Sequence, residues 1–284
     1  MPTTDSPLRY PGGKTQLAPF VSDLLRVNDL TRGIYAEPFA GGAGIAWRLL
    51  FAGHIGEVWL NDIDLGIHSF WKMVLEQPED LCERIEKTPV TMRQWYEQRR
   101  ILASSNDTLK LAFATLFLNR TNRSGIIAGG VIGGKAQTGD YKLDCRFNKE
   151  ELSDKILRIA GHREVIRLSR LDARICIAKW SKRLPKRSLI NVDPPYFTKG
   201  HELYTNFYEP KDHRALAKTI RGLKCAWMLT YDDTPEIERL YTGLPTYRKA
   251  LTYYAQVKRR ANELLVLAPT LRPPAGLNQP SQAA

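Results

Sequence analysis

Four consecutive residues, Asp193-Pro194-Pro195-Tyr196, combine a carboxylate, two rigid prolines and an aromatic ring. They follow the apolar run 188–192, which is typical of a buried strand. Proline fixes the backbone, so the carboxylate and the Pro194 carbonyl would form two fixed acceptors that suit an amino group. The amino nitrogen of adenine is a poor nucleophile, and two such hydrogen bonds would localise its lone pair toward a methyl sulfonium. The motif therefore predicts methyl transfer to a flipped base stacked on Tyr196, although it can also be a stiffened turn after a strand.

A second pattern predicts a cofactor site. The glycine-rich turn 40–44 follows a strand-like run at 33–39, and glycines there let a ligand approach the backbone. Asp62 follows the next strand-like run, 57–60, and stands 18 residues after Gly44. A carboxylate at this place can accept both hydroxyls of a ribose, whereas a surface acid that caps the next helix is the alternative. The spacing fits an adenosine-containing cofactor but does not point specifically to NAD, because the full Gly-x-Gly-x-x-Gly pattern is absent.

The tripeptide Gly13-Lys14-Thr15 could end a phosphate-binding loop. That loop needs a glycine five positions earlier and a preceding buried strand. The residue at that position is Leu8, and the upstream segment is polar. Both requirements fail, so ATP or GTP hydrolysis is excluded.

The charge of the chain is concentrated in its middle. The net charge is +12, and residues 81–190 hold 23 lysines and arginines against 11 aspartates and glutamates. A surplus confined to one segment is typical of a surface that binds a polyanion such as nucleic acid. The four cysteines are scattered singly, which predicts no disulfide framework and no metal site. No apolar run is long enough for a membrane span and no charged-then-apolar leader precedes Arg9, so we expect a soluble, intracellular protein.

The elements that would position these residues alternate between strands and helices. A helix is expected to begin near Thr15. Two strand-and-helix units follow, with helices that end near Gly53 and at about residue 76, and they predict a parallel sheet covered by helices. From Pro78 three helical stretches follow without a strand, the last over 107–120. Residues 121–148 carry six glycines and predict a hairpin or a functional loop. Sheet-like runs then return, and the last two, 247–254 and 263–268, come late in the chain.

Four motifs in order resemble those of the Dam-type, alpha-group DNA adenine N6 methyltransferases. They are Tyr10-Pro11-Gly12-Gly13-Lys14, Phe39-Ala40-Gly41-Gly42, Asn61-Asp62-Ile63 and Asp193-Pro194-Pro195-Tyr196. The resemblance covers nearly the whole chain up to the strand at 263–268. It implies a Rossmann-like α/β fold, a mostly parallel sheet with a late antiparallel strand, and an inserted helical and hairpin lobe that recognises DNA.

The resemblance also implies roles for particular residues. The catalytic residues would be Asp193, Pro194, Pro195 and Tyr196. S-adenosylmethionine would contact Tyr10, Gly12, Gly13, Lys14, Phe39, Gly41, Gly42, Asp62, Ile63, Asp172 and Asp193. The catalytic domain would comprise residues 1–77 and 162–270, the lobe 78–161, and a disordered tail 271–284. We expect no metal, and we expect a cytoplasmic monomer of a prokaryote or phage that acts on duplex DNA.

One stretch departs from the family pattern. Relatives that read GATC commonly carry an Asn-Arg-Phe-Asn-Gly-like segment, whereas this chain has Asn119-Arg120-Thr121-Asn122-Arg123-Ser124-Gly125. Arg120 and Arg123 are candidates for guanine or phosphate contacts, beside Asn119. Lys135, Lys142 and Arg146 are candidates for phosphate contacts. The target sequence therefore stays open.

Other reactions were compared with this prediction. Methylation of cytosine at C5 needs a nucleophilic cysteine, characteristically after a proline, and none of the four cysteines follows one. Methylation of cytosine at N4 has the same chemistry, although the resemblance associates it more often with serine at position 193. Protein glutamine methylation is associated with asparagine at that position and leaves the basic middle segment unexplained. A catalytically inactive DNA-binding relative is a further alternative, although Lys14, Asp62 and Asp193 are all present.

Overall fold

The structure, a computed structural model, describes residues 4–9, 14–198, 200, 206–254, 258–275 and 277. A seven-stranded sheet forms its centre, with the order β3-β2-β1-β4-β5-β7-β6. The strands are β1 (Ile34–Glu37), β2 (Glu57–Asn61), β3 (Ile166–Ser169), β4 (Ser188–Val192), β5 (Ala226–Asp232), β6 (Thr246–Tyr254) and β7 (Lys258–Leu267). Strands β1 to β5 run parallel, and β7 pairs antiparallel with both β5 and β6. The predicted α/β class with a late antiparallel strand is confirmed.

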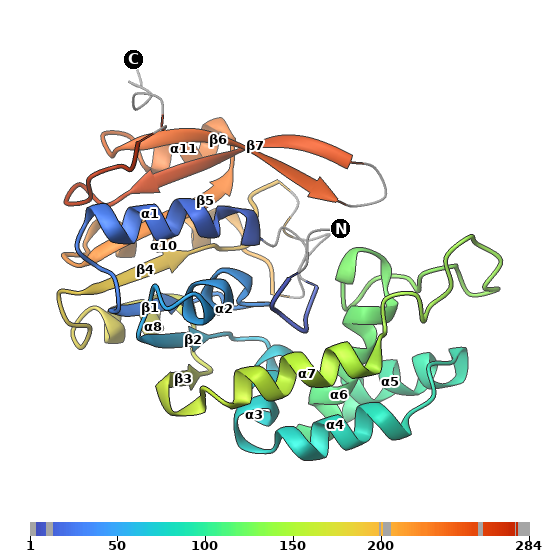
Figure 1. The fold of residues 1–284 in the computed structure, drawn as a ribbon. Coiled ribbons are helices and arrows are strands. Elements are labelled where there is room, and N and C mark those ends of the chain that lie inside the picture. The colour runs from blue at the N-terminus through green and yellow to red at the C-terminus, as the bar shows by residue number, and fades with distance from the viewer. Residues whose placement is uncertain are drawn as a thin grey trace.

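Burial explains why the central strands are so apolar. Every residue of β4 is buried, because β1 and β5 flank it and helices cover the sheet. The helices of this part are η1 (Thr15–Leu17), α1 (Ala18–Val27), α2 (Gly44–Phe51), α8 (Ala173–Trp180), α10 (Pro210–Arg221) and α11 (Pro235–Leu240). Helix α1 packs on α2, and α10 packs on α8 and α11. Figure 1 shows α1 and α2 together in front of the strands.

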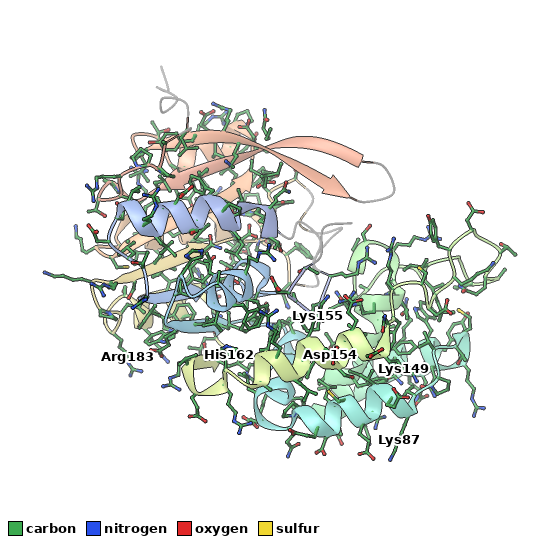
Figure 2. All side chains as sticks on the ribbon, viewed as in Figure 1. Lys87, Lys149, Asp154, Lys155, His162 and Arg183 are labelled. Carbon is green, nitrogen blue, oxygen red and sulfur yellow. The ribbon has the colours of Figure 1, made fainter. Side chains whose placement is uncertain are left out.

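A helical lobe lies to one side of the sheet (Figure 1). It contains α4 (Pro78–Lys87), α5 (Met92–Ser104), α6 (Thr108–Thr121) and α7 (Lys149–Ala160). Helix α3 (Leu65–Glu76) packs on α6 and α7, so packing within the lobe begins one helix before the predicted boundary at residue 78. In Figure 2, Lys87 and Lys149 lie at the same end of the lobe. There the Lys149 ammonium donates to the carbonyl of Glu86, which ties α7 to α4.

Helix α6 is the centre of the lobe. All its residues from Leu111 to Thr121 are buried, because α3, α4 and α5 pack around it. The sequence predicted burial of one face only. The polar residues at its end, among them Asn119 and Arg120, are therefore also enclosed.

The long segment after α6 is mostly irregular. It contains η2 (Arg123–Gly125) and one isolated bridge between Asn122 and Val131. The alternative of a loop thus describes it better than a regular hairpin. We call residues 122–148 the glycine loop.

The C-terminal part differs from the prediction in two respects. Strand β7 begins at Lys258, five residues before the predicted start, because it pairs with β6 along its whole length. The predicted disordered tail begins with a bound segment: the side chain of Asn28 exchanges hydrogen bonds of 2.8 Å with both backbone groups of Arg272. Leu271 is buried. Residues 276 and 278–284 of the predicted tail lie outside the described residues.

Candidate active site

The carboxyl ends of β1, β2 and β4 meet at one edge of the sheet, as in other parallel α/β proteins. Asn61, at the end of β2, is fully buried and ties neighbouring strands together there. Its amide donates to the carbonyls of Pro38 and Leu171 at 3.1 and 3.0 Å. The residues that follow the three strands are thereby held at the same edge of the sheet. Asp62, after β2, and Asp193, after β4, are among them.

Asp193 follows β4, and its side chain is held through one carboxylate oxygen. Its Oδ1 accepts from the ammonium of Lys14 and, at 2.9 Å, from the hydroxyl of Thr230 on β5. No described residue donates to Oδ2, and the side chain is 29% exposed. Among the described residues, the carboxylate is therefore held through Oδ1 alone.

Tyr196 is nearly buried and is fixed at both its ring and its hydroxyl. The hydroxyl donates to Oε1 of Glu263 on β7 at 2.9 Å. The Lys14 ammonium lies 4.9 Å from the ring centroid, within reach of a cation–π contact. Pro194 and Pro195, which stand between Asp193 and Tyr196 in the sequence, are both buried. A base that stacks on Tyr196 would need access to this ring.

Lys14 connects the start of the chain to this site. Its ammonium pairs with Asp193 and lies 3.4 Å from Oε2 of Glu263, and the residue is 4% exposed. The structure thus brings Lys14 and Asp193 together across 179 positions of sequence. The predicted contacts Tyr10, Gly12 and Gly13 lie outside the described residues.

Asp62 organises the glycine turn. Its Oδ2 accepts from the N–H of Gly41 at 2.9 Å, where φ is +46°, and its Oδ1 accepts from the N–H of Asp64 at 3.0 Å. Burial raises the pKa of Asp62 to about 7. Helix α3 is capped by Asp64, which accepts from Ile67 at 3.0 Å, so the capping role considered for Asp62 belongs to its neighbour.

The other predicted cofactor contacts lie around this edge. Gly42 is buried, Phe39 is half-buried, and Ile63 is exposed. Asp172 caps α8, accepting from Arg174 at 3.0 Å, and remains partly exposed. The ring of Tyr208 packs edge-on against Phe39 at 5.8 Å between centroids.

Comparison with known proteins decides the family. The sequence profile of the D12 class N6 adenine-specific DNA methyltransferases matches residues 10–257. The chain belongs to this family. No curated protein matches the chain.

Solved structures also match this D12 methyltransferase. TrmN from Thermus thermophilus is 13% identical with a TM-score of 0.39, and the match covers 89% of this chain and 48% of TrmN. PH1948 from Pyrococcus horikoshii, considered an RNA methyltransferase, is 10% identical with a TM-score of 0.39, over 92% of this chain and 85% of PH1948. This chain thus spans about half the length of TrmN.

Sequence reasoning missed three polar groups of the D12 site. Glu263 and Thr230 contact Tyr196 and Asp193 from β7 and β5. Glu37, the last residue of β1, is 5% exposed and accepts from Asn191 at 3.5 Å. Burial, and then the nearby charge of Asp193, raises the pKa of Glu37 to about 8. For Glu37 and Glu263 the signal in the sequence is a single acidic residue within or at the end of an apolar strand, whereas Thr230 has no such signal.

Two of the predicted DNA contacts are enclosed in the structure. Asn119 is fully buried, and Arg120 is 7% exposed with its Nε donating to the Pro7 carbonyl at 2.6 Å. Burial, followed by the charge of Arg9, lowers the pKa of Arg120 to about 10. Their burial at the end of α6 corrects the prediction that both side chains reach a DNA surface.

The remaining predicted DNA contacts belong to the glycine loop. Arg123, Lys135 and Lys142 are exposed, and Arg146 is half-buried. The Lys142 ammonium donates to the loop carbonyls of Gln137 and Gly139 at 2.7 and 3.0 Å, so it also stabilises the loop. The lobe thus presents basic side chains on the segment that has the least regular structure.

Among the described residues, no helix is both long and apolar enough to cross a membrane. Within the same part of the chain, no cluster of three or more His, Cys, Asp or Glu could hold a metal ion.

Proposed function

We propose that this D12 methyltransferase transfers a methyl group from S-adenosylmethionine to N6 of an adenine flipped out of duplex DNA. One observation carries the proposal. Oδ1 of Asp193 is held by Lys14 and Thr230, which leaves Oδ2 to accept a proton of an amino group. The Pro194 carbonyl would accept the second proton.

The charge of the site fits this cofactor. The carboxyl groups of Glu37, Asp62 and Asp193 line the edge, and Glu263 adds another beside Lys14. When bound, S-adenosylmethionine supplies its methyl group on a positively charged sulfur. Asp62 would accept the ribose hydroxyls, and Glu37 would pair with the ammonium of the methionine end. Asp172, Phe39 and Ile63 would surround the adenine.

Each residue of the Asp193 motif has a separate task. Asp193 and Pro194 orient the amino group so that its lone pair faces the methyl group, in line with the bond that breaks. The nitrogen gains the methyl group and then loses a proton toward solvent past the exposed Oδ2. Tyr196 would support the flipped base, which recovers part of the cost of unstacking. Glu263 orients its ring through the hydroxyl.

The DNA would be held by the basic glycine loop of the lobe. Arg123, Lys135 and Arg146 would contact phosphates or base edges, with Lys142 supporting the loop. We propose that the enzyme acts as a monomer in the cytoplasm of a prokaryote or phage-infected cell.

Mass spectrometry of nucleosides tests the proposal directly. Unmethylated plasmid DNA is incubated with the protein and S-adenosylmethionine, then digested. We expect N6-methyladenine with the wild type and with the exposed-carboxylate control Asp80→Asn, and at least about 100-fold less with Asp193→Asn. N4-methylcytosine instead, or equal methylation by Asp193→Asn, would contradict the proposed reaction.

A further inference from the structure

One side chain at the end of α6 binds the backbone of Arg9. Oδ1 of Asn119 accepts from the N–H of Arg9 at 2.7 Å, and its Nδ2 donates to the Arg9 carbonyl at 2.7 Å. The same Nδ2 donates to the carbonyl of Gly125 at 2.8 Å. An asparagine amide has two donor hydrogens and one oxygen, so this buried side chain is fully used in joining three chain segments.

Gly125 completes the contact from the glycine loop. Its φ is +77°, and a Cβ at this position would lie 2.0 Å from the carbonyl oxygen of Arg9. The loop backbone therefore lies directly against the backbone of Arg9. Any side chain here would have to displace one of the two segments.

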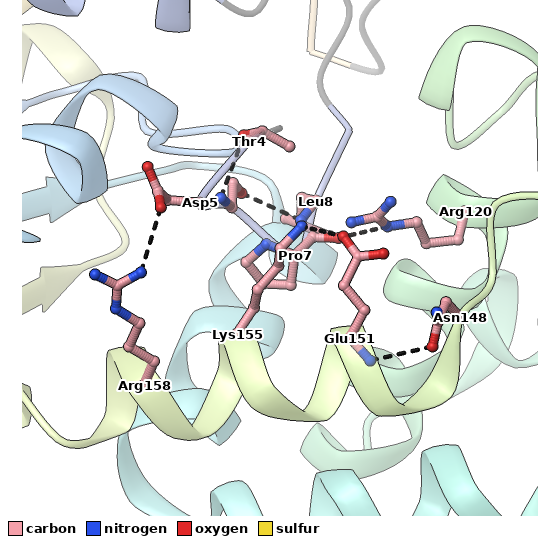
Figure 3. Close-up of polar contacts among 10 residues, drawn as sticks. Thr4, Asp5, Pro7, Leu8, Arg120, Asn148, Glu151, Lys155 and Arg158 are labelled. Atoms are coloured by element: carbon pink, nitrogen blue, oxygen red, sulfur yellow. Dashed lines mark hydrogen bonds and ion pairs between the residues drawn. The ribbon is translucent and has the colours of Figure 1, made fainter. Parts of the chain in front are cut away.

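Further contacts hold the segment 4–9 between the lobe and the sheet. Figure 3 shows Arg120 of α6 donating to the carbonyl of Pro7, and Arg158 of α7 reaching Asp5. Asp5 also pairs with Arg48 of α2 at 3.2 Å. The segment is thus bound by both parts of the molecule.

This segment leads directly to the catalytic site. Lys14 stands five residues after Arg9, a distance of at most about 17 Å along an extended chain, and its ammonium pairs with Asp193. A shift of the glycine loop would move Arg9 through Asn119 and Gly125, and with it the approach to Lys14.

We propose that Asn119 and Gly125 form a junction that couples DNA binding by the glycine loop to cofactor binding at Lys14. The inference rests on the proposed function, since it takes DNA and S-adenosylmethionine as the ligands. It gives the segment Asn119-Arg120-…-Gly125 a positioning role in place of a contact with bases. A coupling of this kind is reciprocal: the cofactor would also tighten DNA binding by the same factor.

The charges at the junction determine the sign of the coupling. Arg120 lies near Arg9 and Arg146, and their mutual repulsion is offset by Glu151. Nη2 of Arg120 is buried and meets no acceptor among the residues that the structure describes. The phosphates of DNA on the loop would weaken this repulsion, so DNA should stabilise the junction and tighten cofactor binding.

A pair of glycine variants tests the coupling. Gly125→Ala places a methyl group against Arg9, whereas Gly134→Ala, in the same loop at φ +74°, has no atom within 4 Å of the added Cβ. The two glycines have similar φ values, of +77° and +74°, so the variants differ chiefly in the contact with Arg9. Asn119→Asp, which loses both donors, is the second test. Isothermal titration calorimetry would measure the Kd of S-adenosylhomocysteine with and without saturating plasmid DNA. S-adenosylhomocysteine is used because it is the reaction product and supports no turnover.

We expect DNA to tighten this binding by roughly fivefold or more in the wild type and in Gly134→Ala. In Gly125→Ala and Asn119→Asp the ratio of the two Kd values should fall toward one. An unchanged ratio in Gly125→Ala, or a ratio of one in the wild type, would overturn the inference while the binding of both ligands still supports the proposed function. A wild type that binds neither ligand contradicts both.

Discussion

The buried carboxyl group of Glu37 makes the stability of the protein depend on pH. Burial raises its pKa from 4.5 to about 8 in the folded protein. Between these two values the folded protein keeps a proton that the unfolded chain releases, so the free energy of unfolding falls as pH rises. One pKa unit is worth about 1.36 kcal/mol, and the loss between pH 4.5 and 8 therefore reaches at most about 5 kcal/mol.

Replacing Glu37 by glutamine removes this titration. The glutamine retains an oxygen that can accept from Asn191, as Glu37 does at 3.5 Å. We expect Glu37→Gln and the wild type to have similar stability near pH 4.5. At pH 8 the variant should be more stable by several kcal/mol, up to about 5.

Urea unfolding followed by tryptophan fluorescence, at intervals from pH 4.5 to 9, measures the difference. Glu164→Gln is the matched control, because its side chain is 92% exposed. Its unfolding free energy should follow that of the wild type across the range. Parallel curves for Glu37→Gln and the wild type would refute the reasoning, because they would show that Glu37 ionises equally in both states.

The same variant tests the proposed partner of Glu37. A bound ammonium favours the ionised carboxylate, so the wild type should release a proton when cofactor binds near pH 7. Calorimetry in two buffers of different ionisation enthalpy counts this proton, and Glu37→Gln should release fewer. Equal proton release by both proteins would place the ammonium elsewhere.

Three further predictions concern the other groups of the site and the lobe. Asp193→Asn should lower kcat by at least about 100-fold, with a smaller change in the Kd of S-adenosylhomocysteine; a change in Kd alone would argue against its role in orienting the amino group. Asp232 accepts from the N–H groups of Phe197 and Thr198 at 2.8 and 3.0 Å, so Asp232→Ala should release the turn after Tyr196 and lower kcat more than it raises the cofactor Kd. Stopped-time methylation assays would measure this, and an unchanged kcat would refute it. Lys135→Ala should reduce the slope of log Kd for DNA against log salt by about 1, and an unchanged slope would remove Lys135 from the DNA surface.

Much of the architecture could be predicted because it depends on local properties of the chain. The apolar run before Asp193 predicted β4, and the prolines after it predicted a rigid end to that strand. The pattern of apolar residues predicted a helix over 65–76, and α3 spans Leu65–Glu76. Nearest neighbours in the sequence decide such features, so they can be read without coordinates.

The sequence did not predict the surroundings of side chains that pack against residues far away in the chain. Asn119 and Arg120 have the residue types that commonly contact DNA, yet they are enclosed because α6 is surrounded on all sides. The sequence contains no local sign of this, since the neighbours are helices from elsewhere in the chain. A buried polar residue must then satisfy its hydrogen bonds internally, which is why Asn119 binds backbone groups.

The sequence by itself predicted Asp193 as the candidate carboxylate, the glycine turn at 40–44, and the succession of strands and helices along the chain. Only the tertiary structure decided that Thr230 and Glu263 support Asp193 and Tyr196, and that Lys14 joins them. Tyr196 and Glu263 are 67 positions apart and meet because β7 inserts antiparallel beside β5. The pairing of strands far apart in sequence depends on the packing of the whole sheet, which no local pattern of residues encodes.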